Sequence, residues 1–222
     1  MIVDNRFYSR QILSINICIF SLNLNKLSVL LVKKKKEPYS NTWSLPEIGL
    51  INKESCEQTI CREIKNNFGF ENFTPRLTGV YSDPKRDKRF RNISLAYYTI
   101  VDENNTSLKE SKKHNLEADW FEIDKIPELA FDNKEVLINS IELLKDKIYD
   151  IPFISQYIKQ PFTLTNLQNL YESILNTKLD KRNFRRKLLT LNCLVDTGRK
   201  NTKDSHKKSS LFKFSRKIKG EN

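Results

Sequence analysis

The sequence predicts an α+β domain followed by a small basic domain made of two helices and a two-stranded hairpin. Three observations predict this division: apolar runs that alternate with period two, an irregular order of strands and helices, and a sharp rise in positive charge after Lys159. At 222 residues with 38% hydrophobic content, the chain is long enough for one medium and one small core. We place the domains at residues 1–150 and 151–222.

The first domain opens with two strands at residues 12–20 and 26–36, which a short hairpin loop joins. A loop and a short strand follow over residues 37–50. From Ser55 the period changes to that of a helix, with Glu54 and Glu57 expected in its first turn, where the helix dipole favours acids. Gly69 follows the last apolar position, as a C-terminal cap would.

Three further strands and one more helix complete this domain. Strands are expected at residues 77–83 and 91–101, a last strand and turn at residues 117–129, and the amphipathic helix at residues 132–148. The periodicity lapses around residues 149–162, where two prolines occur, so the boundary falls there.

The second domain reads as helix, helix and hairpin. Residues 163–176 place five apolar side chains on one helical face, residues 180–192 form a basic helix, and residues 193–200 and 209–214 are β-like. This order describes a winged helix-turn-helix in outline, although many small α+β domains share it.

The positive charge is concentrated in the second domain. The formal net charge is +12, and from Lys159 onward 16 Lys and Arg stand against 5 Asp and Glu. The preceding 158 residues hold 23 basic and 22 acidic side chains. A near-neutral body with a strongly basic end favours a polyanionic partner, most often nucleic acid.

The four cysteines contain no C-x-x-C pair, which favours reduced thiols. The apolar segment from Ile12 to Val32 is interrupted by Asn and Lys, so it is too polar to span a bilayer. No small-residue cleavage site follows it. We therefore expect a cytoplasmic protein without a membrane partner.

Residues 43–70 resemble the Nudix box, the signature of the Nudix hydrolases. Aligned on Arg62-Glu63, the chain keeps Glu54 at the first Glu, Gly69 at the second Gly and the spacing between them. The preceding "WSLPEIG" is similar to the Trp-x-Leu-Pro-Gly-Gly lead-in of the family, with Glu47 and Ile48 in place of two glycines. The resemblance implies an α/β/α sandwich of the Nudix type.

The departures from the box concern its metal. Asn66 and Asn67 replace the acidic pair that holds magnesium together with Glu63 in the family. Residues at i, i+3 and i+4 share a helix face, so the site would lose two negative charges. Magnesium needs charged oxygen ligands. We therefore expect no catalytic residues, no bound metal and no cofactor, with residual hydrolysis left open.

A charged loop, "YSDPKRDKRF", is similar to the Arg-Asp-Pro-Arg loop of ADP-ribose-type Nudix domains, and the "AFDN" of residues 130–133 to the family's Ala-Phe-Asp-His. Two arginines at a pocket can hold phosphates or sugar hydroxyls with paired hydrogen bonds. A solvated charged turn is the alternative. The predicted effector-binding residues are Arg86, Asp87, Arg89 and Glu63.

From Pro161 the chain resembles the C-terminal winged-helix domain of the NrtR-type Nudix-related transcriptional regulators. The shared residues are Phe-Thr-Leu from Phe162, Leu-Gln at Leu167, Tyr-Glu at Tyr171 and the run Leu-Asp-Lys-Arg-Asn-Phe-Arg-Arg-Lys from Leu179. The family's later wing motif survives only as "KKSSLFKF". Together the two resemblances cover nearly the whole chain.

The basic helix has the side chains of a recognition helix. Asp180 would cap it, while Phe184, Leu188 and Leu191 would face inward. Arginine suits guanine, asparagine suits adenine, and hydroxyls suit phosphate or base. A solvated basic face is the alternative. The predicted DNA-binding residues are Thr165, Arg182, Asn183, Arg185, Arg186, Thr190, Lys207, Lys208 and Lys213.

The resulting hypothesis is a transcriptional repressor that binds double-stranded DNA as a homodimer. Its Nudix-like domain would sense a small molecule, either an ADP-ribose-like nucleotide or a sugar, without hydrolysing it. Two rivals stay open: a hydrolase of nucleoside diphosphate derivatives with an unusual metal site, and an RNA-binding protein. The second domain lacks the aromatic platform on which RNA bases stack, which counts against RNA.

Overall fold

The structure is a computed structural model that describes residues 11–23, 26–102, 108, 116–201 and 209–215. The chain divides into two compact units. The first holds most residues up to Ile141, and the second runs from Glu142 onward and includes residues 24–27. Each unit is described by itself.

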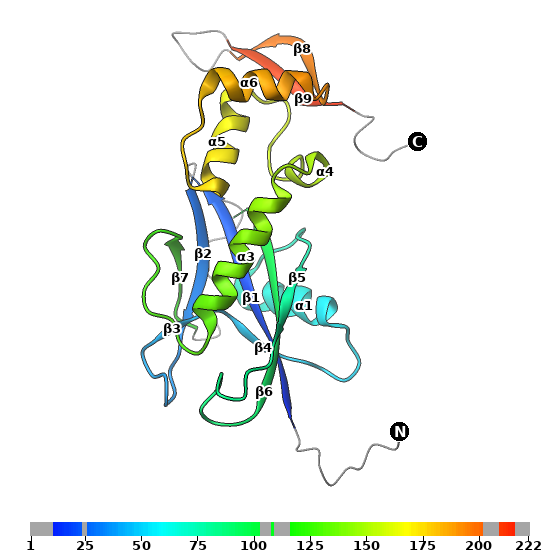
Figure 1. Cartoon of the computed structure of the whole chain (residues 1–222). Coiled ribbons are helices and arrows are strands. Elements are labelled where there is room, and N and C mark those ends of the chain that lie inside the picture. The colour runs from blue at the N-terminus through cyan, green and yellow to red at the C-terminus, as the bar shows by residue number, and fades with distance from the viewer. Residues whose placement is uncertain (1–10, 24–25, 103–107, 109–115, 202–208, 216–222) are drawn as a thin grey trace, which may run out of the picture. The chain divides into compact units, whose positions relative to one another are not determined.

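The first unit contains a mixed sheet with the strand order β3-β2-β1-β6-β5, in which β4 also pairs with β1 and β7 with β2 (Figure 1). The strands are β1 (Ile12–Asn23), β2 (Lys26–Lys33), β3 (Trp43–Ser44), β4 (Glu47–Gly49), β5 (Arg76–Tyr81), β6 (Asn92–Val101) and β7 (Ala118–Glu122). The central pair, β1 and β6, is parallel, with register from Ile12 opposite Asn92 to Ser21 opposite Val101.

Helices cover both faces of this sheet, as a sandwich requires. Helix α1 (Cys56–Phe68) packs on the face that carries Ile15, Ile17 and Ile19. The first part of α3 (Asn133–Lys147) lies on the other face, where the Ser140 and Thr78 hydroxyls lie 2.9 Å apart. In Figure 1 these turns of α3 lie in front of the strands. The predicted strands and helices of this domain are therefore present.

One expectation about α1 is wrong. Glu54 does not lie in the first turn, because Ser55 is the N-cap and the helix begins at Cys56. Ser55 and Gln58 form a reciprocal capping box, so the helix starts after Ser55 and Glu54 lies outside it. Gly69 takes the left-handed conformation, φ 77°, as its predicted capping role requires.

The second unit holds a short helix α4 (Ile151–Ile154), the helices α5 (Leu164–Leu175) and α6 (Lys181–Thr190), and the hairpin β8 (Leu194–Lys200) with β9 (Ser210–Phe214). Helix α4 occupies the segment whose sequence shows no periodicity, because Asp150 caps it and Pro152 lies in its first turn. Leu167, Leu170 and Ile174 of α5 are buried, as is Leu188 of α6.

The inward face of α6 differs from expectation at its end. Leu188 is buried and Phe184 half-buried, but Leu191 is 54% exposed. The helix stops at Thr190, and Leu191 is its C-cap, so the helical spacing that predicted its burial no longer applies. None of the helices in the described ranges is both long and apolar enough for a membrane span.

Candidate functional site

The Nudix-box residues of α1 form a closed network of hydrogen bonds. Arg62 donates through Nε to Glu54 Oε1 at 2.8 Å and through Nη2 to Glu54 Oε2 at 2.9 Å. Its third nitrogen, Nη1, donates to Glu63 Oε1. The hydrogen bonds from Arg62, followed by that from Thr59, hold the pKa of Glu54 below its usual value, although burial opposes the shift.

Glu63 is engaged on its second oxygen as well. Asn67, one turn further along the helix, donates from Nδ2 to Glu63 Oε2 at 2.9 Å. In the family pattern an acid occupies this position, and it would repel Glu63 unless a cation lay between them. The amide replaces that arrangement with a direct bond.

This donor set offers a magnesium ion fewer charged oxygens than the family pattern, because Asn66 and Asn67 stand where that pattern has acids. All four carboxylate oxygens of Glu54 and Glu63 also accept hydrogen bonds from Arg62, Thr59 or Asn67. A hard divalent cation requires several charged oxygens at once. Within the ranges that the structure describes, no group of three or more His, Cys, Asp or Glu residues is placed to hold a metal.

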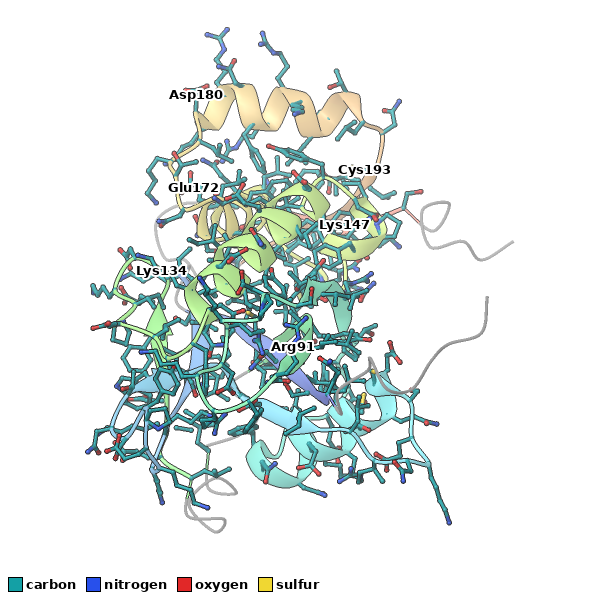
Figure 2. The ribbon with its side chains drawn as sticks, turned by 60° about the horizontal axis from the view of Figure 1, so that its bottom comes forward. Arg91, Lys134, Lys147, Glu172, Asp180 and Cys193 are labelled. Atoms are coloured by element: carbon teal, nitrogen blue, oxygen red, sulfur yellow. The ribbon has the colours of Figure 1, made fainter. Side chains whose placement is uncertain are left out.

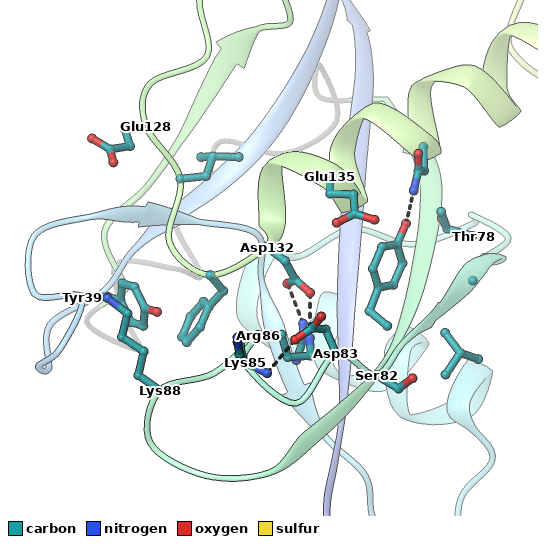
Figure 3. Close-up of a pocket in the computed structure, with 16 residues that line it drawn as sticks. Tyr39, Thr78, Ser82, Asp83, Lys85, Arg86, Lys88, Glu128, Asp132 and Glu135 are labelled. Atoms are coloured by element: carbon teal, nitrogen blue, oxygen red, sulfur yellow. Dashed lines mark hydrogen bonds and ion pairs between the residues drawn. The ribbon is translucent and has the colours of Figure 1, made fainter.

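A polar pocket with a volume of about 800 Å³ lies between β5, the charged loop and the start of α3 (Figure 3). Arg86 forms part of its floor. The guanidinium donates to both oxygens of Asp132 at 2.8 Å and to Asn16 Oδ1 at 3.2 Å, and the side chain is 3% exposed. Arg86 is therefore held in a fixed position by a buried fork.

Asp87 and Arg89 form a second fork in the same loop. Arg89 donates from Nε and Nη2 to the Asp87 carboxylate at 3.0 and 2.7 Å, and its backbone N–H donates to the same group at 3.0 Å. Burial tends to raise the pKa of Asp87, but the Arg89 hydrogen bonds outweigh it and the pKa is lowered. The Arg89 guanidinium also lies 5.2 Å from the Phe131 ring centroid.

Phe131 and Tyr39 make an aromatic wall of the pocket, with ring centroids 4.2 Å apart. Phe131 has a positive φ of 59°, which is unusual for a bulky residue and is maintained by its surroundings. Lys34 Nζ also lies 5.1 Å from the Phe131 ring. The remaining charged lining residues have both signs: Lys85 and Lys88 are basic, whereas Asp83, Glu128 and Glu135 are acidic.

The four predicted effector residues do not all meet at this pocket. Arg86 lines it, and Asp87 and Arg89 lie in the adjoining loop. Glu63 belongs to α1, on the face of the sheet that carries Ile15 and Ile17, whereas Asn16, the partner of Arg86, points to the opposite face. The binding roles of all four residues stay predictions.

Sequence reasoning missed Asp132, Tyr39 and Phe131 as parts of this pocket. The "AFDN" similarity marked residues 130–133 and so contained the signal for two of them. The pairing of Asp132 with Arg86 spans 46 residues, and no local pattern indicates it.

The second unit presents α6 as an exposed basic helix. Asp180 caps it by accepting from the Asn183 backbone N–H at 2.8 Å. The residues of its outer face are all exposed: Arg182, Asn183, Arg185, Arg186 and Thr190. Figure 2 labels Asp180 at the start of this helix and shows long side chains projecting from it.

Two contacts order the outer face of α6. Arg186 Nη2 donates to Asn183 Oδ1 at 3.2 Å. The Thr190 hydroxyl donates to the backbone oxygens of Arg186 and Lys187 at 3.0 and 2.8 Å. Its proton is therefore used within the helix, and its oxygen can only accept a hydrogen bond from a partner. Thr165 is exposed near the start of α5.

The hairpin carries further positive charge. Lys213 is exposed on β9, while Lys207 and Lys208 lie outside the described residues. Arg199 and Lys200 are also exposed, on β8, and were not predicted. They follow Gly198, which has φ 70° and lies where the hairpin register shifts between Asp196 and Lys200, and Lys200 pairs with Ser210. The basic pair after a glycine was the available signal.

The comparison with protein families decides the assignment of the first unit. The family model of the NUDIX domain matches residues 13–140, more than half of the chain. The chain belongs to the NUDIX family. The family model of the NrtR DNA-binding winged helix domain matches residues 155–214. Both predicted resemblances, and the predicted fold class, are thereby confirmed.

Curated relatives of this NUDIX chain include a regulator and an enzyme. The ADPR responsive transcriptional repressor NtrR of Acinetobacter baylyi is 26% identical over 197 residues, covering 86% of this chain and 77% of the relative. The ADP-ribose pyrophosphatase of Methanocaldococcus jannaschii is 34% identical over 109 residues, covering 49% and 63%. The second similarity leaves hydrolysis open for this chain.

Solved structures agree with the fold. Shewanella oneidensis NrtR complexed with a 27mer DNA has a TM-score of 0.74 at 23% identity, covering 93% of this chain and 95% of that one. A MutT/nudix family protein from Enterococcus faecalis has a TM-score of 0.73 at 20% identity, covering 95% and 90%. The NUDIX domain of the Shewanella protein complexed with ADP ribose has a TM-score of 0.50 at 21% identity, covering 64% and 94%.

Proposed function

We propose that this NUDIX-family chain is a transcriptional repressor that binds double-stranded DNA through residues 151–222. The observation that carries the proposal is the match of residues 155–214 to a DNA-binding winged helix domain. The exposed arginines of α6 and the basic wing supply the groups that contact phosphates and base edges. A repressor relative similar over 86% of the chain supports the same assignment.

The NUDIX domain, residues 1–150, serves in this proposal as the effector-binding domain. Its ligand is ADP-ribose or a related nucleotide sugar, the class that two of the similar proteins are described with. The Arg86–Asp132 fork fixes the pocket floor, and Tyr39 with Phe131 provides an aromatic wall suited to a base or sugar ring. A simple sugar is the alternative ligand.

In this proposal the NUDIX domain senses its ligand without hydrolysing it. Arg62 offsets one of the two negative charges of Glu54 and Glu63, and Asn66 and Asn67 supply none, so less negative charge is left to attract magnesium than the family's acidic pair would provide. The repressor acts as a homodimer, since two-fold symmetric operators present two half-sites. Sedimentation of the purified protein checks the dimer.

The DNA test begins with selection from a random duplex library on the full chain. Fluorescence anisotropy then compares the selected duplex with a scrambled duplex of the same composition. We expect tighter binding to the selected duplex and a change in that affinity when ADP-ribose is added. Equal binding to both duplexes at low salt would overturn the proposed function.

The similarity to an ADP-ribose pyrophosphatase favours a second candidate, hydrolysis of ADP-ribose. Incubation with ADP-ribose and magnesium, followed by chromatography of the products, tests it. Our proposal expects no turnover above that of the Glu63→Gln variant. Turnover at ordinary enzyme rates that Glu63→Gln abolishes would assign the chain to the enzymes.

A further inference from the structure

The winged-helix unit contains a second pocket, separate from the NUDIX domain, with a volume of about 360 Å³. Its volume lies within the range of small-molecule pockets, roughly 300–1,000 Å³. Along one face of α6 it is lined at intervals of three or four residues, from Asp180 through Phe184 and Lys187 to Leu191. Tyr149 and Tyr171 line it from outside α6.

The interior of this pocket is aromatic. The rings of Tyr149 and Tyr171 lie 6.1 Å apart, and those of Tyr171 and Phe184 lie 5.2 Å apart, both edge to face. Tyr171 and Leu188 are 4% and 3% exposed, while Tyr149 and Leu191, at 56% and 54%, form an open rim. Three aromatic rings around one cavity suit a flat aromatic ligand.

One polar group of the interior lacks a protein partner. Among the residues that the structure describes, none forms a hydrogen bond with the Tyr171 hydroxyl. The Tyr171 hydroxyl is therefore available to a polar group of a ligand.

The two ends of the pocket carry opposite charges. Lys187 Nζ lies 4.8 Å from the Tyr149 ring, and no carboxylate in the described ranges pairs with it. Asp180, seven residues earlier, is roughly 10 Å away along the helix at 1.5 Å per residue. Its carboxylate already accepts the Asn183 N–H. A ligand anion is therefore favoured at the Lys187 end.

We propose that this pocket is a second ligand site, which binds a small aromatic carboxylate or sulfonate with its ring among Tyr149, Tyr171 and Phe184 and its anion at Lys187. The site does not depend on the NUDIX pocket or on DNA. A bound ligand would contact Asn183 of α6, which lines the pocket and accepts a hydrogen bond from Arg186. Ligand binding can in this way alter the position of the Arg186 side chain.

The test uses the full chain and the fluorescent aromatic sulfonate 8-anilinonaphthalene-1-sulfonate, without DNA. Leu191→Trp fills the rim of the pocket and should weaken binding of this probe at least about tenfold. The matched control is Leu189→Trp, because Leu189 is also 54% exposed but does not line the pocket. The control should stay within about twofold of the original protein.

Two further variants test the polar contacts. Lys187→Gln should weaken probe binding about two- to fivefold, and Lys187→Arg should restore it. Tyr171→Phe should weaken it by a similar factor, because only the hydroxyl is lost. At constant ionic strength benzoate should displace the probe, whereas benzylamine, which has the same ring and the opposite charge, should not.

A specific site and unspecific adsorption of the probe predict different results. Equal loss in Leu189→Trp and Leu191→Trp, or equal displacement by benzoate and benzylamine, would overturn the proposal in favour of unspecific adsorption. A sedimentation change in Leu191→Trp alone would show that a second copy of the chain covers the pocket, which also overturns it. Since no DNA is present, failure here leaves the proposed repressor function untouched.

Discussion

Arg86 shows how a residue typical of a ligand site can also be part of the core. Its side chain is 3% exposed, and Asp132 and Asn16 accept hydrogen bonds from its Nε and Nη2. A ligand that took over these two nitrogens would have to displace Asp132, which costs the energy of a buried ion pair. We therefore infer that Arg86 shapes the NUDIX pocket, while groups at its edge, such as Lys85 and Lys88, meet the ligand.

Replacing Arg86 tests this role through stability. Arg86→Ala leaves Asp132 without its partner in a half-buried site, and we expect the free energy of unfolding to fall by about 3 kcal/mol. Urea titration followed by Trp fluorescence reports on this domain, because both tryptophans, Trp43 and Trp120, lie in it. The control Lys125→Ala, which breaks an exposed ion pair, should cost less than about 1 kcal/mol. Equal losses would contradict the inference.

Restoring the acids of the Nudix box should restore a cation site. In the double variant Asn66→Glu and Asn67→Glu, Glu63 loses the Asn67 amide and gains two carboxylates as neighbours. We expect affinity for Mn²⁺ to rise about tenfold or more, because cation affinity follows the number of charged oxygens. Isothermal titration calorimetry measures it. An original protein that binds Mn²⁺ as tightly as the variant would refute our account of the box.

At the scale of the element, the connection between α5 and α6 depends on Glu172. Its carboxylate accepts from Lys178 Nζ at 2.8 Å, from the Leu179 N–H at 3.0 Å and from Gln168 at 2.8 Å. The Lys178 bond is the largest cause that lowers the pKa of Glu172 to about 2. Burial of the group opposes the shift. This one side chain thereby ties residues 178 and 179, which precede the N-cap Asp180 of α6, to helix α5.

The lowered pKa predicts an acid-sensitive turn. Glu172 is ionised in the folded state down to pH about 2, whereas its pKa in an unfolded chain is about 4.3. The stability it contributes is therefore complete above pH about 4.3 and is lost as the pH falls toward 2. Thermal unfolding followed by circular dichroism should show Glu172→Gln less stable at pH 7 and nearly equal at pH 2. A difference independent of pH would contradict this cause.

Helix α6 provides the test of base recognition. Asn183→Ala or Arg186→Ala should reduce discrimination between selected and scrambled duplexes by about 1–3 kcal/mol if the side chain contacts a base. Lys181→Ala, on the first turn of the same helix, should weaken binding to both duplexes alike. Anisotropy titrations at one fixed salt concentration measure both effects. Equal losses on the two duplexes would mark Asn183 and Arg186 as phosphate contacts.

The positions of helices and strands were more predictable from the sequence than the contacts between side chains. Period and capping residues placed α1, α5, α6 and most strands close to their observed positions, because these signals are local. The sequence could not place Leu191, since the end of α6 decides its exposure. It could not show that Arg62 occupies both Glu54 oxygens, or that Asp132 holds Arg86, because these contacts join side chains that only the folded chain brings together.

At the scale of the whole molecule, the net positive charge lies almost entirely in the winged-helix domain, while the NUDIX domain is nearly neutral. From Lys159 onward the chain carries 16 basic and 5 acidic residues, and the rest is almost neutral. A neutral first domain avoids unspecific attraction to DNA, so affinity is confined to the second domain.

This division predicts a steep dependence on salt. A plot of log K against log salt concentration should have a slope between about −4 and −8, since each neutralised phosphate contributes about −0.9. The slope should be similar for selected and scrambled duplexes, because phosphate contacts are independent of sequence. Anisotropy in a series of KCl concentrations measures it. A slope near zero would exclude an electrostatic interface.

The parallel pairing of β1 with β6 also affects how fast the chain can fold. Ile12 meets Asn92 and Ser21 meets Val101, so the centre of the NUDIX sheet closes a loop of about 80 residues. Such distant contacts slow folding, whereas the neighbouring helices of the winged-helix unit make local contacts. The DNA-binding part should therefore reach its native state first in refolding, even though a ribosome synthesises it after the NUDIX domain.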